Sequence, residues 1–397
     1  MTTVDDERTA GFVGPHDPEL TRRALDHVHD ETTDLAPSVL PVPRWYYGAE
    51  SVLEREHALL RTTPLAIVAS ARIPGVHDYV VREVLETSIL VTRAADGVAR
   101  AFLNYCRHRG ARPADGCGNA RRFTCPYHAW TYDGEGQLVG MPGQRGFDTV
   151  DRSTTGLVEL PSEERHGFVW VVLTAGAPLD LDTHLGPLDA ELAQWDTATY
   201  QHHVYRDLES HVSWKAALEA FAESYHFPYV HGSSVIGMNT IPDIGVHDGL
   251  GRHHRLCFPY PWIRQHDEGE ASWDPVDNVA IIYWVFPNLV LAYSPVGVEL
   301  IDILPAGAPT RCSLRHSWLA RHAAEDDDTR AGYDSLFAQV HAALRDEDFG
   351  MLPQCGDGIR NGQHSHLLIG RNEIAVQHVV RAFAAALDLD LTASGPP

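Results

Sequence analysis

Two short runs of cysteine and histidine constrain the fold of this chain more than any other feature of its sequence. Cys106-Arg107-His108 is followed sixteen residues later by Cys125-Pro126-Tyr127-His128, which gives the pattern C-x-H-x16-C-x2-H. Each run lies in a β-rich stretch, so two short hairpin loops can bring the four side chains to one place. Thiolate and neutral imidazole are good ligands for transition metals, and the pattern therefore predicts a metal centre built by these two cysteines and two histidines.

The order of the ligands separates two kinds of metal centre. A [2Fe-2S] cluster can be held by two cysteines on one iron and two histidines on the other. Zinc fingers instead favour C-x2-4-C followed by H-x3-5-H, which the alternating Cys-His-Cys-His order does not follow. The iron–sulfur cluster is the favoured interpretation, and a Cys2His2 zinc site is the alternative. The remaining cysteines are expected to be buried small hydrophobic side chains; they are Cys117, Cys257, Cys312 and Cys355.

A second candidate centre lies in the segment 213–231. Glu219, Glu223 and His226 have the i, i+4, i+7 spacing of one helical face, in a helix expected from Ser213 to Tyr225. A proline at position 228 interrupts this helix and can return His231 to the same face. Two imidazoles and one carboxylate would form the facial triad of a mononuclear Fe(II) site, with open positions for O2 and substrate.

Composition excludes several classes of function. The chain has 31 Lys+Arg against 54 Asp+Glu, a formal charge of −23, so nucleic acid and anionic membrane surfaces are not expected as partners. No apolar run approaches the roughly 18 residues of a membrane span, and the first twenty residues lack a secretory pattern. A cytoplasmic location is expected.

The pattern of short β runs and longer helical stretches predicts an α+β chain. A small antiparallel β domain is expected over 64–175, with hairpin turns at Ala95-Asp96-Gly97 and Asp133-Gly134-Glu135-Gly136. An arm with helices is expected over 1–63, and an α+β domain with an antiparallel sheet and a long helix pair over 176–397.

The two metal motifs carry a family resemblance. The stretches YCRHRGARP and CPYHAWTYDGEGQLVG resemble those of Rieske non-haem iron oxygenases, and the likeness covers roughly residues 45 to 385. Neither ligand run has the additional cysteine of respiratory Rieske proteins, which favours the oxygenase type. The resemblance implies a Rieske domain whose [2Fe-2S] cluster is bound by Cys106, His108, Cys125 and His128, followed by a helix-grip-like catalytic domain.

The same resemblance assigns roles in the second centre. It implies that His226 and His231 bind a mononuclear Fe(II), and that Glu223 connects this site to a Rieske histidine. The third ligand in the family is an Asp near the end of a late helix, which corresponds to Asp348, with Asp346 and Asp357 as competing candidates. Glu rather than Asp at position 223 is closer to members that oxidise quaternary ammonium compounds, and Ala220 stands where many members carry Asn.

The implied function is that of a terminal oxygenase acting on a small organic substrate with O2. Since no G-x-G-x-x-G follows a strand, electrons are expected from a separate NAD(P)H-dependent reductase or a ferredoxin. A homotrimer is implied, in which one subunit's cluster serves its neighbour's iron. A Rieske electron carrier and a zinc-stabilised binding protein are the alternatives. Five mostly aromatic residues of the expected strands could line a pocket for an aromatic ring or a quaternary ammonium group. The same residues would suit the core of a sheet equally well; they are Tyr283, Trp284, Phe286, Leu289 and Tyr293.

Overall fold

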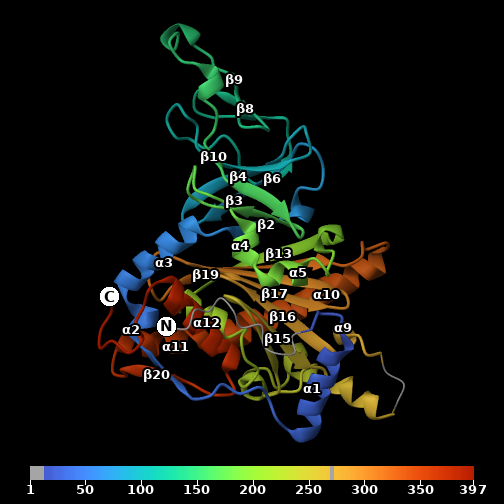
Figure 1. Ribbon diagram of the computed structural model, residues 1–397. Helices are drawn as coiled ribbons and strands as arrows, with labels where there is room; N and C mark the ends of the chain where they lie inside the picture. Colours follow the sequence, from blue (N-terminus) through green and yellow to red (C-terminus); the bar gives the residue numbers. More distant parts are fainter. Residues whose placement is uncertain (1–12, 269–271) are drawn as a thin grey trace. The chain divides into compact units, whose positions relative to one another are not determined.

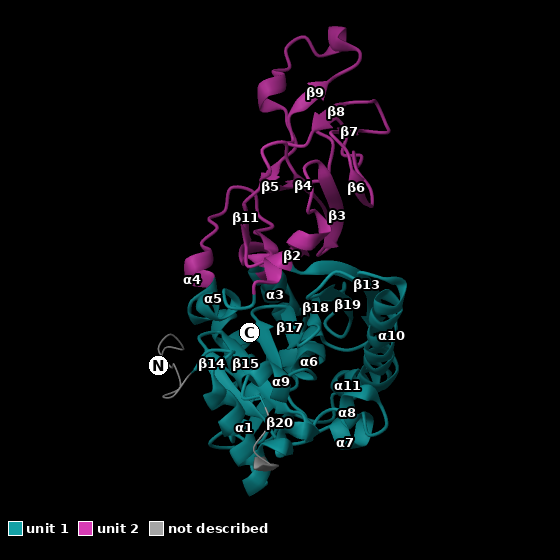
Figure 2. Ribbon diagram, turned by 90° about the vertical axis from the view of Figure 1, so that its right-hand side faces the viewer, with its two compact units in different colours: residues 1–59, 185–195, 200–397 teal, residues 60–184, 196–199 magenta. Residues whose placement is uncertain are grey.

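The computed structural model describes residues 13–268 and 272–397 of the chain (Figure 1). Residues 1–12 of the predicted N-terminal arm lie outside the described residues. The chain divides into two compact units, which Figure 2 colours separately. The small unit comprises residues 60–184 and 196–199, and the large unit comprises residues 1–59, 185–195 and 200–397.

The small unit is built from antiparallel strands. They are β2 (Leu65–Ala69), β3 (Asp78–Val84), β4 (Thr87–Arg93), β5 (Ala99–Leu103), β6 (Cys117–Asn119), β7 (Arg122–Thr124), β8 (Thr131–Asp133), β9 (Leu138–Gly140), β10 (Glu159–Leu160), β11 (Ser162–Arg165) and β12 (Phe168–Val171). They form three sheets with the orders β10-β5-β4-β3-β6, β11-β12-β2 and β7-β8-β9. Both Asp-Gly turns predicted from the sequence connect adjacent antiparallel strands, β4 to β5 and β8 to β9.

A compact apolar cluster fixes the loops of the small unit. Cys106 and Cys125 belong to it together with Phe102, Trp130 and Tyr132, and all five side chains are buried. Close packing also explains a glycine in the β8–β9 turn. Gly136 has φ +77°, and a Cβ there would lie 2.5 Å from the ring of Phe102, so only glycine satisfies both the backbone and the packing. The cysteine loops are therefore supported by a rigid core.

The large unit contains a seven-stranded antiparallel sheet with the order β13-β19-β18-β17-β16-β15-β14. Its strands are β13 (Gln201–Ser210), β14 (Val246–Leu250), β15 (His253–Pro259), β16 (Val279–Val285), β17 (Leu289–Ser294), β18 (Gly297–Pro305) and β19 (Cys312–Ala320). A separate two-stranded sheet pairs β1 (Leu40–Pro43) with β20 (His366–Ile369). Together with the strands of the small unit, this confirms the predicted α+β class with antiparallel sheets.

Helices surround this sheet (Figure 1). They are α1 (Pro18–Asp30), α2 (Trp45–Gly48), α3 (Glu50–Thr62), α5 (Pro187–Leu192), α6 (Trp214–Glu219), α7 (Phe227–Val230), α8 (Val235–Met238), α9 (Pro275–Asn278), α10 (Asp327–Ala343), α11 (Phe349–Asn361) and α12 (Ile374–Ala386), with α4 (Leu181–Leu185) at the edge of the small unit. Helix α6 packs on β18 and β19, α10 on β13 and β19, and α12 on β14 and β15.

The helix predicted from Ser213 to Tyr225 is shorter than expected. Helix α6 ends at Glu219, and α7 begins only at Phe227. Directly after α6 the backbone makes i→i+3 bonds, from the N–H of Phe221 to Leu218 and from the N–H of Ala222 to Glu219. Further along, the N–H of His226 donates to the carboxylate of Glu223 at 3.1 Å instead of to a helical carbonyl. The turn between α6 and α7 thus replaces the regular helical face that the spacing predicted.

Two other features were not predicted from the sequence. A π-helical turn, Leu344–Asp348, follows α10, and α11 continues beyond it. The expectation that four cysteines are buried is wrong for Cys117 and Cys355, which are exposed. Among the described residues, no helix is long and apolar enough to cross a membrane.

Two candidate metal centres

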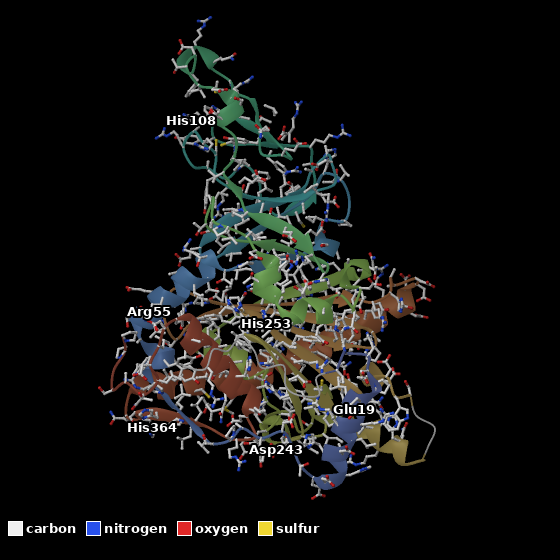
Figure 3. The ribbon with its side chains drawn as sticks, in the orientation of Figure 1. Glu19, Arg55, His108, Asp243, His253 and His364 are labelled. Carbon is white, nitrogen blue, oxygen red and sulfur yellow. The ribbon has the colours of Figure 1, made fainter. Side chains whose placement is uncertain are left out.

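Two mirrored loops in the small unit carry the first set of predicted ligands. The N–H of Cys106 donates to the carbonyl of Ala111, and the carbonyl of Cys106 accepts from Gly110. Cys125 makes the same pair of bonds with Trp130 and Ala129. Each cysteine is therefore held at the base of a tight loop whose histidine follows two or three residues later. Figure 3 marks His108, in the loop between β5 and β6.

The side chains of these loops come together as two pairs. The thiols of Cys106 and Cys125 interact with each other, and the rings of His108 and His128 have centroids 4.4 Å apart. The Nδ1 atom of His108 is buried and has no hydrogen-bond partner, as expected of a ligand atom. Two pairs match a [2Fe-2S] cluster, in which each iron takes two protein ligands.

The zinc alternative fits this arrangement less well. A tetrahedral zinc ion requires four ligand atoms that converge on one point. Within residues 13–268 and 272–397, the only group of three or more His, Cys, Asp or Glu whose ligand atoms all lie within 4.8 Å is in the large unit. The geometry of the cysteine and histidine loops therefore favours the iron–sulfur cluster.

Tyr132 is part of this centre, and the sequence reasoning missed it. Its hydroxyl accepts from the N–H of Arg107 at 3.0 Å and lies 3.2 Å from the Sγ of Cys106, where it can donate to the sulfur once the cysteine is a thiolate. Burial raises the pKa of the Cys106 thiol, and the hydrogen bond with Tyr132 acts in the opposite direction. Its place on β8, seven residues after Cys125, is the only sequence signal that could have indicated it.

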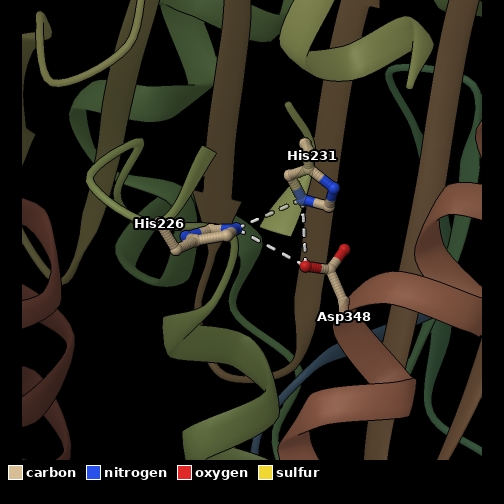
Figure 4. Close-up of side chains that lie close together, drawn as sticks. All are labelled: His226, His231 and Asp348. Carbon is tan, nitrogen blue, oxygen red and sulfur yellow. Dashed lines mark hydrogen bonds and ion pairs between the residues drawn. The ribbon is translucent and has the colours of Figure 1, made fainter. Parts of the chain in front are cut away.

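The second centre is formed by His226, His231 and Asp348 in the large unit (Figure 4). The two Nε2 atoms are 3.2 Å apart, and Oδ1 of Asp348 lies 3.4 Å from Nε2 of His226 and 3.0 Å from Nε2 of His231. Two ligands at right angles, each about 2.1 Å from a divalent ion, would be separated by about 3.0 Å. The three atoms thus fit a facial triad, which leaves the opposite side of the ion open.

Each histidine of the triad also contacts a second carboxylate through its other ring nitrogen. Nδ1 of His226 contacts Oε1 of Glu223, and Nδ1 of His231 lies 2.6 Å from Oε2 of Glu347. Burial lowers the pKa of His226, but the hydrogen bonds with Asp348 and Glu223 outweigh burial and raise this pKa to about 9. Burial raises the pKa of Asp348, but its bonds with both histidines hold that pKa below the usual range.

The two competing candidates for the third ligand pair with arginines and do not join the triad. Asp346 is exposed and pairs with Arg345 at 2.5 Å, and Asp357 is exposed and pairs with Arg360.

The five residues considered for an aromatic pocket wall belong to the core, with exposures of 0–3%. Tyr283 donates to Glu191 at 2.7 Å, and Tyr293 stacks on Trp195 at a centroid distance of 3.9 Å. The sheet-core interpretation of these residues is therefore favoured.

A cavity of about 270 Å³ borders the triad. Apolar side chains from α11, β20 and α12 form much of its wall, and its acidic members are Glu219, Glu223, Asp348 and Glu373. Tyr47 donates to one carboxylate oxygen of Glu219 at 2.7 Å, whereas the other oxygen is buried without a partner. Burial raises the pKa of Glu219 to about 8, against the effect of the Tyr47 bond.

Two family models match the chain in the order of its two centres. The Rieske [2Fe-2S] domain matches residues 63–154, and the catalytic domain of the ring-hydroxylating alpha subunit matches residues 197–388. The fold and the two centres thus define an iron–sulfur protein with an additional mononuclear metal site. The chain belongs to the Rieske non-haem iron oxygenase family, as an alpha-type oxygenase subunit.

Curated relatives include enzymes of two kinds. The oxygenase subunit of carnitine monooxygenase from Acinetobacter pittii is 28% identical over 200 residues, which are 48% of this chain and 52% of the relative. The large oxygenase component of the naphthalene 1,2-dioxygenase system from Ralstonia sp. is 33% identical over 183 residues, 43% of this chain and 40% of the relative. The chain thus spans about half the length of these relatives.

A solved structure supports the fold. The quaternary ammonium Rieske monooxygenase CntA, in complex with an inhibitor, superposes with a TM-score of 0.75 at 21% identity, covering 87% of this chain and 96% of the other. At this identity the likeness shows a shared fold and leaves the substrate open.

Proposed function

We propose that this chain is the terminal oxygenase of a multicomponent system, in which a Rieske cluster in 64–175 supplies electrons to a mononuclear Fe(II) in 176–397. The observation that carries the proposal is the presence of both ligand sets in one chain. A simple electron carrier would not need a buried triad of two imidazoles and a carboxylate with an adjoining cavity. An NAD(P)H-dependent reductase or a ferredoxin would deliver the electrons.

The residues of the chain have distinct tasks in this function. When bound, the cluster supplies single electrons and the Fe(II) supplies O2 activation. Tyr132 directs its hydroxyl proton at the sulfur of Cys106, which stabilises negative charge there. Glu223 accepts a hydrogen bond from Nδ1 of His226, which leaves Nε2 free to face the ion. Asp348 offsets part of the charge of the metal.

The cavity favours a substrate with a positively charged, otherwise apolar group. Its walls are apolar, and Glu219 and Glu373 border it. Burial raises the pKa of both carboxyl groups, and a bound cation would favour their ionised forms, which an uncharged ring would not do. One oxygen of Glu219 is buried without a partner, and the charge of a cationic ligand would compensate the ionised carboxylate there. A small quaternary ammonium compound therefore fits the cavity better than naphthalene does.

Metal analysis and turnover together test this function. The purified protein should contain about three irons and two acid-labile sulfides per chain, since a [2Fe-2S] cluster accounts for only two irons. With a surrogate reductase, O2 consumption should be coupled to product from a quaternary ammonium compound and not from naphthalene. Two irons without the third would support an electron carrier, and zinc without sulfide would support a binding protein.

A homotrimer in which Glu223 accepts a hydrogen bond from a neighbour's cluster histidine is part of the proposal. Charge supports it, although the whole chain is strongly acidic. Residues 105–124 carry five arginines against one acidic residue, and the five are exposed; they are Arg107, Arg109, Arg112, Arg121 and Arg122. Glu223 itself offers a carboxylate of the opposite charge.

Mixing of two inactive variants tests the exchange of electrons between subunits. His108→Ala should lose the cluster and keep the mononuclear iron, and a variant without Asp348 should do the opposite. If each cluster serves the neighbouring subunit, mixed oligomers should recover part of the wild-type turnover. The measurement is O2-dependent product formation after subunit exchange is verified by mass. An active monomer, or exchanged oligomers that stay inactive, would contradict the intersubunit route.

A further inference from the structure

The π-helical turn Leu344–Asp348 places two consecutive acidic residues against one imidazole. His231 is 1% exposed at its side chain, and its Nε2 faces Asp348 at 3.0 Å. Its Nδ1 faces Glu347 at 2.6 Å. Consecutive residues of a helical turn point in different directions, and here the two carboxylates approach the ring at different nitrogens. Both nitrogens of His231 are thus held by a segment 116 residues further along the chain.

When Nε2 of His231 binds a metal ion, the remaining proton of the ring lies on Nδ1, where Glu347 accepts it. A carboxylate accepts a hydrogen bond from Nδ1–H, which leaves the lone pair on Nε2, on the side of Asp348 and His226. The distance of 2.6 Å is that of a charge-assisted bond, which is roughly twice as strong as a neutral one. Without this bond, the ring could rotate or carry its proton on the nitrogen that faces the metal.

We propose that Glu347 is a positioning residue of the mononuclear centre, which orients His231 and holds the ring proton on Nδ1 when Nε2 binds the ion. The turn that supplies Asp348 therefore also arranges a second ligand. Glu223 has the same relation to His226 from a different segment, so each histidine has its own carboxylate. The inference rests on the metal site of the proposed function but not on turnover or on the identity of the substrate.

Equilibrium binding of Co(II) to protein freed of its mononuclear metal tests this role. Glu347→Ala should weaken Co(II) binding by about 10- to 100-fold, the usual effect of removing a carboxylate behind a ligating histidine. Glu347→Gln should recover part of the affinity, because its amide oxygen still accepts from Nδ1–H. The visible absorption of bound Co(II), which reports ligand geometry, should change in the alanine variant and move back toward wild type in the glutamine variant.

Asp346→Asn is the matched control. Asp346 is the adjacent acidic residue, is exposed and pairs with Arg345 rather than with a histidine, so its variant should bind Co(II) as the wild type does. The Rieske absorption should be unchanged in all variants. Wild-type affinity and spectrum in Glu347→Ala would overturn the proposal, as would an equal loss in Asp346→Asn. Because no step of this test requires turnover, it can fail while the oxygenase function stands, or succeed while that function fails.

Discussion

Asp348→Ala should bind mononuclear iron more than about 100-fold more weakly and lose turnover, while the Rieske spectrum is retained. Among the described residues, Asp348 is the only carboxylate that contacts the Nε2 atoms of both histidines, at 3.4 and 3.0 Å. Two neutral imidazoles alone would leave the charge of Fe(II) uncompensated in a largely buried site. The cluster should be unaffected because its ligands belong to the other compact unit. Iron analysis, visible absorption and product formation measure the three expectations.

Asp346→Ala and Asp357→Ala are the controls for this variant. Both residues were competing ligands on the basis of sequence, and both pair with an arginine in the structure. Each should keep its iron and its turnover. If Asp348→Ala retained full iron content while one of these variants lost it, the assignment of the third ligand would be wrong.

Most candidate ligands of the two centres could be proposed from the sequence because their spacing is local, whereas Asp348 was assigned only by the family resemblance. Cys106 and His108, or Cys125 and His128, need only one tight loop each, and His226 and His231 need only one turn. The two hairpin turns at Asp96-Gly97 and at residues 133–136 were likewise predicted correctly, because Asp-Gly sequences between β runs favour such turns. Ligand spacing of this kind can be recognised in a sequence without knowledge of the fold.

Other parts of the site depend on contacts between distant residues. Glu347 contacts His231 across 116 positions, and the π turn that allows this contact has no recognised sequence signature. Helical periodicity reveals neither the early end of α6 nor the bond between Glu223 and the backbone of His226. The aromatic residues of β16 and β17 show the same alternation whether they face a pocket or a core.

The largest effect on stability is expected for Lys215→Met, with a loss of about 3–5 kcal/mol in the free energy of unfolding. Lys215 is the only lysine of the chain, is fully buried at the start of α6, and pairs with Glu56 of α3 at 2.6 Å. Its ammonium also donates to the carbonyl of Tyr46 and lies 3.5 Å from the centroid of that ring. Burial lowers the pKa of Lys215, and Glu56 acts against this effect.

The cost should arise from the partner that is left behind. In Lys215→Met, the carboxylate of Glu56 stays buried with Trp214 as its remaining partner, through Nε1 at 2.6 Å. The double variant Glu56→Gln/Lys215→Met removes the buried charge and should regain most of the stability. The single and the double variant are compared by their midpoints of urea unfolding, measured with the cluster and the mononuclear iron bound. A single variant as stable as wild type, or a double variant no better than the single one, would show that this pair does not hold α6 against the N-terminal helices.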